Sequence, residues 1–557
     1  MVNRVIKLIY SEVRDMHKVA FVIAFFTLGS QLLAFVRNRL LAHNFGAGYE
    51  LDLYNAAFKI PDLLFALFSS VLSVYVLLPF VLKAREERGS KAAANTLGQM
   101  FTFFVYCYLT VTVALFIFLP QILPVIFSDT MMEHKETLIN LTRILLLQPY
   151  ILGISSLFSV VTQIAQKFIL YALCPIVYNL GIIIGIVFFQ PWLGLPGLVW
   201  GVVLGAAMHM VVQWPMVAKS PLSFGLVGKL DWQLLKSIFT TAVPRAVTLS
   251  VNQIVLLVLV IMMSKMTEGS ITVFQFAFDL QSVPLTLIGM SYSVAAFPVL
   301  ADLFAQKKQK IFNEHIYTAF RHIVFWSVPA MALILVLRAH IVRVVLGSGA
   351  FDWDDTKLTA AILALFVVAL AAQALIMLLV RAFYAGGRTK TPLLIALFGA
   401  GVTIVSAPLF VKLYYAEEGF RHWLEVVFRL EGVAGTEVLT VALAFVLGSL
   451  VQMAILLVMA VRDFSLTLAG LGRRFLEAVL AATAGGGVSY LALDFLKGGV
   501  NQETFIGITL QGAVAGFLGL SATILIYYLL GSEELRDIYQ SIRSRLGRRK
   551  KNSSVKN

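Results

Sequence analysis

The chain has 557 residues, of which 59% are hydrophobic and only 13% are charged. A soluble chain of this length would carry about a quarter charged residues, so the composition excludes an ordinary soluble protein and indicates many membrane spans. The net charge of +14 would suggest nucleic-acid binding in a soluble chain. Here the basic residues stand mainly between apolar segments, and we expect no nucleic-acid partner.

Fourteen apolar runs are long enough to cross the hydrocarbon core as helices, which takes about 20 residues each. We therefore predict an all-α polytopic membrane protein with about 14 transmembrane helices. The runs lie near residues 19–42, 53–82, 95–122, 138–164, 168–190, 193–218, 234–263, 271–301, 312–336, 358–384, 391–413, 437–461, 475–496 and 505–530.

The lysines and arginines predict the orientation. Of the 44, 29 fall in the two terminal segments and in every second connection, against nine in the other connections and six within spans. Cytoplasmic loops carry the excess of positive charge, so we expect a multi-pass protein of the cell membrane with both termini in the cytoplasm. We expect segment 1–18 to be retained rather than cleaved, and the basic tail 531–557 to face solvent or lipid headgroups.

The sequence shows no catalytic or metal-binding motif. Cys107 and Cys174 lie in apolar runs, where buried thiols are commoner than a disulfide. Asp352, Asp354 and Asp355 form an acidic cluster without the glycine and glutamate of a calcium loop. We therefore expect a protein that is not an enzyme and holds no cofactor.

Two segments six spans apart share a plan. Phe58–Ala84 and Phe278–Phe304 each open with polar residues and a proline, Pro61 or Pro284, and each carries serines mid-span. A shift of six spans predicts two parallel six-helix halves, because an even number of spans preserves orientation. The predicted domains are an N-lobe at 19–218, a C-lobe at 219–461 and two further helices at 462–530.

The stretch RNRLLAHNFGAGYELDLYNAAFK, residues 37–59, places charged residues at or inside membrane spans. A charge at bilayer depth is costly, so one that persists usually faces a protein interior or a wet cavity. Arg37 and Lys59 are cations of this kind, and Asp52 begins the second span. We predict that they form part of a polar site inside a transporter.

Each of these residues also has a structural interpretation. Asp52 is either the N-cap of its own helix or a partner that positions Arg37. Lys59 and Asp62 are three residues apart and share a helix face, so a structural ion pair is the alternative to a ligand site. Gly46 suits a left-handed helix stop, and Gly48 suits the same role. Pro61 should bend the second span, and we expect Gly46, Gly48 and Pro61 to act as hinges.

The second half of the chain also carries polar residues inside its predicted spans. Arg245 stands early in the seventh span, and Asn252 and Gln253 follow about two turns later. Arg245 is either a cavity residue or an arginine that extends to the interface. Asp279 lies deeper, in the eighth span, and we expect it to face a cavity; Pro284 is a fourth candidate hinge.

Residues 35–61 resemble the MurJ/MviN family of lipid II flippases, which belongs to the MOP exporter superfamily. The family pattern is an arginine near the end of span one, a Phe-Gly-x-Gly turn, an aspartate opening span two, and Ala-Phe-Lys/Arg-hydrophobic-Pro. A second match is Arg381-Ala-Phe-Tyr-Ala followed by Thr389-Lys-Thr-Pro392. The residues that match in the first motif are Arg37, Phe45, Gly46, Gly48, Asp52, Ala57, Phe58, Lys59, Ile60 and Pro61.

The resemblance implies two six-helix lobes around a central cationic cavity, with the last two helices lining a groove for a lipid tail. It also implies that lipid II, the peptidoglycan precursor, moves from the cytoplasmic to the outer leaflet by alternating access for cell wall synthesis. Some cationic positions of the family differ here: Gln31, Phe65-Ala66 and Asp279 stand where arginines are common.

We take the substrate-binding candidates to be Arg37, Asp52, Lys59, Asp62, Arg245, Asn252, Gln253 and Asp279. The expected partners are a polyprenyl-pyrophosphate-linked glycan and membrane lipids, bound by a monomer. Energy would come from a coupling ion or the membrane potential. The alternatives are a flippase of another polyprenyl-linked oligosaccharide, a drug exporter of the same superfamily, a membrane-embedded transferase and a non-transporting scaffold.

Overall fold

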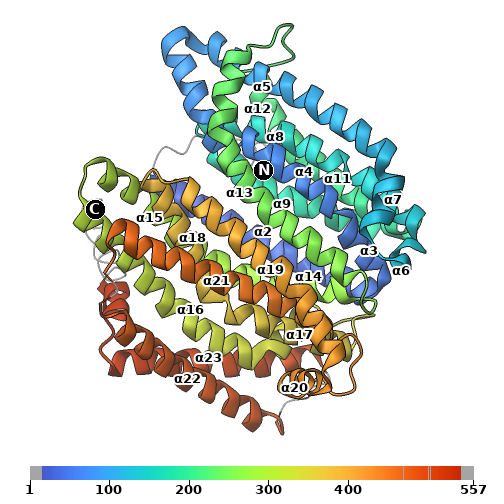
Figure 1. Ribbon diagram of the computed structural model, residues 1–557, viewed down its shortest axis with the longest axis vertical. Helices are drawn as coiled ribbons and strands as arrows, with labels where there is room; N and C mark the ends of the chain where they lie inside the picture. Colours follow the sequence, from blue (N-terminus) through green and yellow to red (C-terminus); the bar gives the residue numbers. More distant parts are fainter. Residues whose placement is uncertain (1–15, 468, 500, 502–503, 541–557) are drawn as a thin grey trace, which may run out of the picture. The chain divides into compact units, whose positions relative to one another are not determined.

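The computed structural model describes residues 16–467, 469–499, 501 and 504–540; for 16–21, Tyr75, 244–245 and 249 it describes the backbone alone. Within these residues every regular element is a helix, which confirms the all-α prediction (Figure 1). The chain divides into two compact units. Unit 1 comprises 1–275 with 345–355, and unit 2 comprises 276–344 with 356–557.

Unit 1 contains the helices from α2 to α13, and α14 (Ser270–Leu285) begins in it. The elements are α2 (Met16–Phe45), α3 (Tyr49–Ala57), α4 (Lys59–Leu72), α5 (Val74–Ile126), α6 (Asp129–Met132), α7 (Lys135–Leu145), α8 (Leu147–Ile164), α9 (Phe168–Ile184), the π-helix η1 (Gly185–Phe189), α10 (Gln190–Leu193), α11 (Leu195–Val211), α12 (Trp214–Ala218) and α13 (Trp232–Met263).

Unit 2 contains most of α14 and the helices that follow. They are the π-helix η2 (Thr286–Met290), α15 (Ser291–Ala305), α16 (Gln309–Val345), α17 (Trp353–Val368), α18 (Leu370–Ala385), α19 (Lys390–Ala416), α20 (Glu418–Phe428), α21 (Val438–Phe464), α22 (Leu471–Leu496) and α23 (Phe505–Leu529).

Eleven helices, or up to 12 when a bent pair counts as one span, are long and apolar enough to cross a membrane within the described residues. The protein is therefore a multi-span membrane protein, but the predicted count of fourteen is not confirmed. One reason is that residues 49–126 count as a single helical stretch although they hold two of the predicted runs. The backbone departs from helical geometry at Gly89, where φ is 80° and ψ is 179°.

Glycines let α9 and α11 pack closely in unit 1. A Cβ added to Gly181 would lie 2.3 Å from the Cα of Gly205, and one added to Gly185 would lie 2.4 Å from the Cα of Gly201. Gly181 lies on α9 and Gly185 opens η1, which continues it, whereas Gly201 and Gly205 lie on α11. Each pair is four residues apart, so the glycines form facing stripes. Close backbone approach of this kind replaces the hydrophobic driving force that lipid does not supply.

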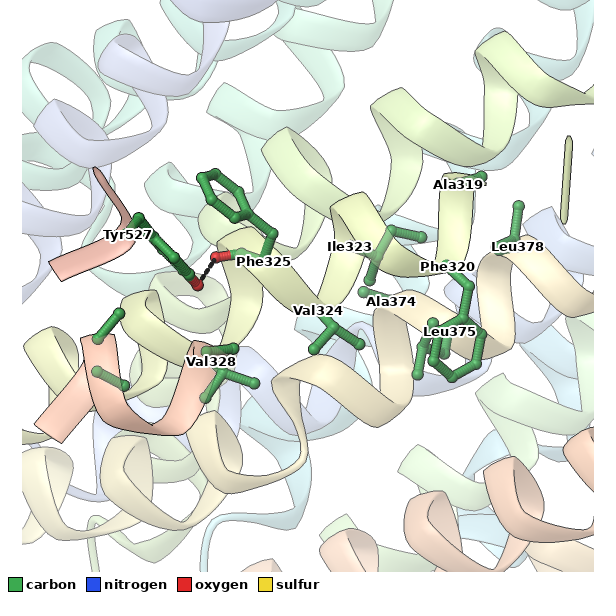
Figure 2. Packing of buried hydrophobic residues seen from close by; sticks show 13 residues of the cluster. Ala319, Phe320, Ile323, Val324, Phe325, Val328, Ala374, Leu375, Leu378 and Tyr527 are labelled. Atoms are coloured by element: carbon green, nitrogen blue, oxygen red, sulfur yellow. Dashed lines mark hydrogen bonds between the residues drawn. The ribbon is translucent and has the colours of Figure 1, made fainter. Parts of the chain in front are cut away.

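A hydrophobic cluster joins α16, α18, α22 and α23 in unit 2 (Figure 2). Ile323 and Leu378 are fully buried in it. The hydroxyl of Tyr527 donates a 2.9 Å hydrogen bond to the backbone carbonyl of Phe325, and the two rings stack with centroids 4.2 Å apart. The last span is thus fixed to α16 by both packing and a buried polar contact.

Candidate functional site: a polar cluster in unit 1

The turn between α2 and α3 is set by glycine. Gly46 has φ +63° and its amide donates to the carbonyl of Ala42 at 2.9 Å, so it ends α2 as predicted. A Cβ at this position would lie 2.7 Å from the carbonyl oxygen of Ala350. Gly48 differs from the prediction: it is the extended residue that precedes α3, with φ −128°. Their use as hinges stays a prediction.

Asp52 caps a helix other than its own. One carboxylate oxygen accepts from the amide of Gly269 at 2.8 Å, and the other accepts from the amide and the hydroxyl of Thr272 at 2.8 and 2.7 Å. These groups open α14, so Asp52 acts as an N-cap supplied from α3. The prediction that it caps its own helix is wrong, because Gly48 holds that position. Its predicted part in substrate binding stays a prediction.

Arg37 lies near the end of α2 and is held by amide groups. Its Nε and Nη2 donate to the side-chain oxygen of Asn38 at 3.0 and 2.9 Å. Its Nη1 donates to the side-chain oxygen of Asn179, on α9, at 3.2 Å. Amide oxygens are neutral acceptors, so these three bonds fix the orientation of the guanidinium.

Asn179 connects this arginine to its surroundings. It is 7% exposed, and its Nδ2 donates to the hydroxyl of Ser30 on α2 at 3.1 Å and to the carbonyl of Pro175 at 3.1 Å. The amide can therefore present only its oxygen to Arg37. This arrangement fixes both the amide and the guanidinium that it orients.

Tyr178, which precedes Asn179 on α9, extends the cluster. It lies within electrostatic reach of Arg37, Asp62 and Tyr54. Its hydroxyl accepts a 3.1 Å hydrogen bond from the side-chain amide of Gln148 on α8. The oxygen of that amide is buried and has no hydrogen-bond partner in the described residues. An unsatisfied buried acceptor is costly and indicates a place for a donor group of a ligand or water.

Lys59 and Asp62 both lie in the first turn of α4. Lys59 is 7% exposed, and its Nζ donates to the side-chain oxygen of Gln275 at 3.2 Å. Asp62 is half-buried and within electrostatic reach of Lys59, as their spacing predicts. The break between α3 and α4 falls at Phe58, three residues before Pro61, whose missing N–H leaves the carbonyl of Ala57 without its usual helical donor.

The remaining candidates lie on α13 and α14. Arg245 lies on α13, and its side chain is outside the described part of the chain. Asn252 is exposed and Gln253 is half-buried, two turns further along that helix. Asp279 is half-buried in the part of α14 that belongs to unit 2. Convergence of these residues with Arg37 in one cavity stays a prediction.

Pro284 lies inside α14, close to its end. The π-helix η2 follows at Thr286–Met290. Short π-helical segments are often found at functional sites, and a proline nearby removes one backbone donor. The local geometry thus fits a hinge, and the hinge itself stays a prediction.

A second arginine, Arg321 on α16, has a different environment. It pairs with Glu533 at 2.5 Å, Glu534 at 3.1 Å and Asp537 at 2.8 Å, all in the segment that follows α23. Arg474 joins the group through Glu533 at 2.7 Å. Carboxylates therefore surround the guanidinium of Arg321 and neutralise its charge.

Sequence reasoning did not identify four members of the unit 1 cluster. They are Asn38, Gln148, Tyr178 and Asn179. Polar side chains inside apolar runs were the available signal, since a buried amide or phenol in a membrane span must find a partner. The pairing of α9 with α2, which brings Asn179 to Arg37, is a tertiary fact that spacing along the chain does not show.

The fold and the cluster together define a polytopic helical membrane protein with a cation held in a polar interior. The model of the family described as "Lipid II flippase MurJ" matches residues 41–509. The chain therefore belongs to the MurJ family.

Similar proteins agree with this membership. A "Probable lipid II flippase MurJ" of Bdellovibrio bacteriovorus is 26% identical over 535 residues, covering 94% of this chain and 96% of that protein. Its counterpart in Buchnera aphidicola subsp. Acyrthosiphon pisum is 27% identical over 411 residues, covering 72% of this chain and 80% of that protein.

Solved structures share the fold. "Lipid II flippase MurJ, inward closed conformation" matches with a TM-score of 0.72 at 21% identity, covering 92% of this chain and 99% of that chain. An inward-facing multidrug resistance MATE family transporter of the MOP superfamily matches with a TM-score of 0.65 at 14% identity, covering 78% of this chain and 94% of that chain. These likenesses support the fold alone.

Proposed function

We propose that this protein is a transporter that translocates lipid II from the cytoplasmic to the outer leaflet of the cell membrane. Family membership supports this activity. The observation that carries it in the structure is Arg37, a cation inside unit 1 whose guanidinium is oriented by the amide oxygens of Asn38 and Asn179. A flippase needs such a group, because the pyrophosphate and the polar head of its substrate are costly to move through hydrocarbon.

In this mechanism the guanidinium of Arg37 binds the pyrophosphate through its forked donors. Lys59 adds a second positive charge from the start of α4. Tyr178 and Gln148 offer neutral hydrogen-bonding groups to the sugar and peptide parts of the head. The polyprenyl tail stays in lipid throughout, so only the head requires a polar path.

Asp62 has a releasing role in the proposal. Its carboxylate lies within electrostatic reach of Lys59. A conformational change that strengthens this pair would weaken the hold of Lys59 on the pyrophosphate. Alternating access then converts substrate binding on one side into release on the other, driven by a coupling ion or the membrane potential. We propose that the protein acts as a monomer with both termini in the cytoplasm.

The test uses purified protein in lipid vesicles loaded with labelled lipid II on the inner leaflet. Wild-type protein should expose the label to an outside enzyme or quencher, and Arg37→Gln should not. The control is Arg143→Gln, since Arg143 is a half-buried arginine of the same unit that donates to the backbone carbonyl of Phe116 and lies outside the polar cluster.

The same assay distinguishes the substrate. Translocation of another polyprenyl-linked oligosaccharide, with lipid II left in place, would contradict the lipid II assignment while keeping the flippase class. Wild-type translocation by Arg37→Gln would contradict the role of the site.

A further inference from the structure

The connection between α19 and α21 contains a short helix with an exposed apolar face. This helix, α20, begins two residues after the end of α19, and both flanking helices are long and apolar enough to span a membrane. Connectivity therefore places α20 close to the membrane surface. Figure 1 shows it as a separate short helix beyond the long helices of unit 2.

Some apolar side chains of α20 are buried in unit 2, and others are exposed on its surface. Leu424 is fully buried against unit 2, whereas Trp423 is 53% exposed and Val427 is 49% exposed. The ring of Phe420 stacks on that of Trp423, with centroids 6.3 Å apart. Tyr415, near the end of α19, is also exposed. An amphipathic helix of this kind lies in the membrane interface with its apolar face among acyl chains.

The polar side of α20 is anchored to its own unit. Glu425 accepts from Arg421 at 2.8 Å and from the hydroxyl of Thr436 at 3.3 Å. Thr436 in turn shares a hydrogen bond with the hydroxyl of Tyr414 on α19. The charge of Arg421 is thus locally paired, and α20 is held in one orientation.

The other end of α20 carries a different arginine. Arg429 follows the helix in the left-handed backbone conformation, with φ +57°, and its side chain is exposed. It lies within electrostatic reach of Arg338, near the end of α16, and of Lys497, at the end of α22. Lys497 pairs with Asp494 at 2.7 Å. In the part of the chain that the structure describes, no carboxylate pairs with Arg338 or Arg429.

Arg338 and Arg429 lie within electrostatic reach of each other at the same end of unit 2, and an anion bound between two such cations would be attracted by both. Arg338 is half-buried, and its Nη1 donates to the carbonyl of Leu335 in its own helix at 2.9 Å, so its position is fixed. Guanidinium groups bind phosphate oxygens through paired donors. The ligand that this geometry fits is therefore a phosphate at membrane-surface depth.

We propose that α20, Arg338 and Arg429 form a phospholipid-binding site at the membrane surface, with the apolar face of α20 among the acyl chains and the two arginines on the lipid phosphate. The site lies within unit 2, apart from the unit 1 cluster that carries the proposed function. By the predicted orientation it faces the outer leaflet. Its occupant is a membrane phospholipid, which it binds whether or not the substrate is present.

The first test measures phospholipid retained by the full-length protein, using phosphatidylglycerol in native mass spectrometry. Arg429→Gln and the double variant Arg338→Gln/Arg429→Gln should lose several-fold of the retained lipid. Arg421→Gln is the matched control, because it removes the same charge from the same segment where Glu425 already neutralises it. Retention equal to wild type in the double variant would overturn the proposal.

A competition arm separates a lipid from a soluble anion. Inorganic phosphate in excess should leave the retained phosphatidylglycerol unchanged. If inorganic phosphate displaces it, the site binds a soluble anion and the lipid assignment is wrong. The melting temperature of Arg429→Gln, measured in the same samples, should equal that of wild type, because Arg429 is exposed.

The second test locates α20 relative to the membrane. Spin labels at residues 427 and 422 are compared in vesicles, in a chain with Cys107→Ala and Cys174→Ala. The label at 427 should be more accessible to oxygen than to a water-soluble nickel complex, and the label at 422, on the polar face, should show the opposite order. Equal access of the nickel complex to both positions would overturn the proposal.

Discussion

Arg37 and Arg321 are both arginines inside long apolar helices, but their partners differ in charge. Arg37 donates three hydrogen bonds to the amide oxygens of Asn38 and Asn179. Arg321 is surrounded by the carboxylates of Glu533, Glu534 and Asp537. Neutral amide oxygens orient the guanidinium of Arg37, whereas carboxylates both hold and neutralise that of Arg321.

The difference separates two uses of a buried cation. A neutralised arginine contributes to folding, because removing it leaves several carboxylates without a partner. The proposed function instead assigns the amide-oriented guanidinium of Arg37 to an anionic ligand. The account therefore assigns stability to the unit 2 cluster and substrate binding to the unit 1 cluster.

The largest effect on stability should come from Arg321→Gln. Breaking a buried charge network costs about 3–5 kcal/mol, and the partial exposure of Glu533 and Asp537 lowers our expectation to about 2–3 kcal/mol. The melting temperature in detergent should fall clearly below that of Arg143→Gln. An unchanged melting temperature would show that the cluster is not structural.

Asp52→Asn should come next. The carboxylate accepts three hydrogen bonds from the first turn of α14, and an amide keeps one oxygen while its NH₂ group faces a backbone donor. Loss of a charge-assisted bond of this kind costs about 1–3 kcal/mol. The expected result is a lower melting temperature with translocation per folded molecule largely retained. Complete loss of translocation with full stability would instead support a direct role in substrate binding.

Two substitutions at Asn179 separate the orientation of the Arg37 guanidinium from its charge. Asn179→Ala removes the acceptor on α9, worth about 1–1.5 kcal/mol, and should lower translocation about tenfold. Asn179→Asp keeps an acceptor oxygen but adds a negative charge beside Arg37. The account predicts that this variant translocates no better than Asn179→Ala. Rescue by Asn179→Asp would show that the contact matters for packing and that the charge of Arg37 does not.

The smallest effect is a pH dependence in the unit 2 cluster. Partial burial raises the pKa of Glu533, but attraction to Arg474 and Arg321 outweighs it and leaves the pKa below the ordinary value of 4.5. A lowered folded-state pKa contributes stability that is complete above about pH 4.5 and is lost as the pH falls below it. Glu533→Gln should therefore flatten the melting-temperature profile below pH 4.5. The same acid-side slope in both proteins would exclude this group as its cause.

The sequence predicted some features of this contrast and missed others. The cationic character of residues 37–59, the helix stop at Gly46 and the neighbourhood of Lys59 and Asp62 follow from local spacing and residue type. The capping of α14 by Asp52 joins residues more than two hundred positions apart, and no local pattern shows it.

The partners of the two arginines show the same limit. Asn179 and the carboxylates from Glu533 to Asp537 reach Arg37 and Arg321 only because α9 packs on α2 and because the segment after α23 folds back onto α16. Helix periodicity predicts which residues share a face of one helix, but it does not predict which helices meet. The number of spans differs for a related reason, since two helices that meet at a kink at Gly89 count together as one stretch, α5.

The most direct test places Arg37→Gln and Arg321→Gln side by side, measuring lipid II translocation per folded molecule in preparations whose melting temperatures are known. The account predicts that Arg37→Gln melts like wild type and translocates nothing, whereas Arg321→Gln melts earlier and translocates normally per folded molecule. Wild-type translocation by a fully folded Arg37→Gln protein would contradict the central claim.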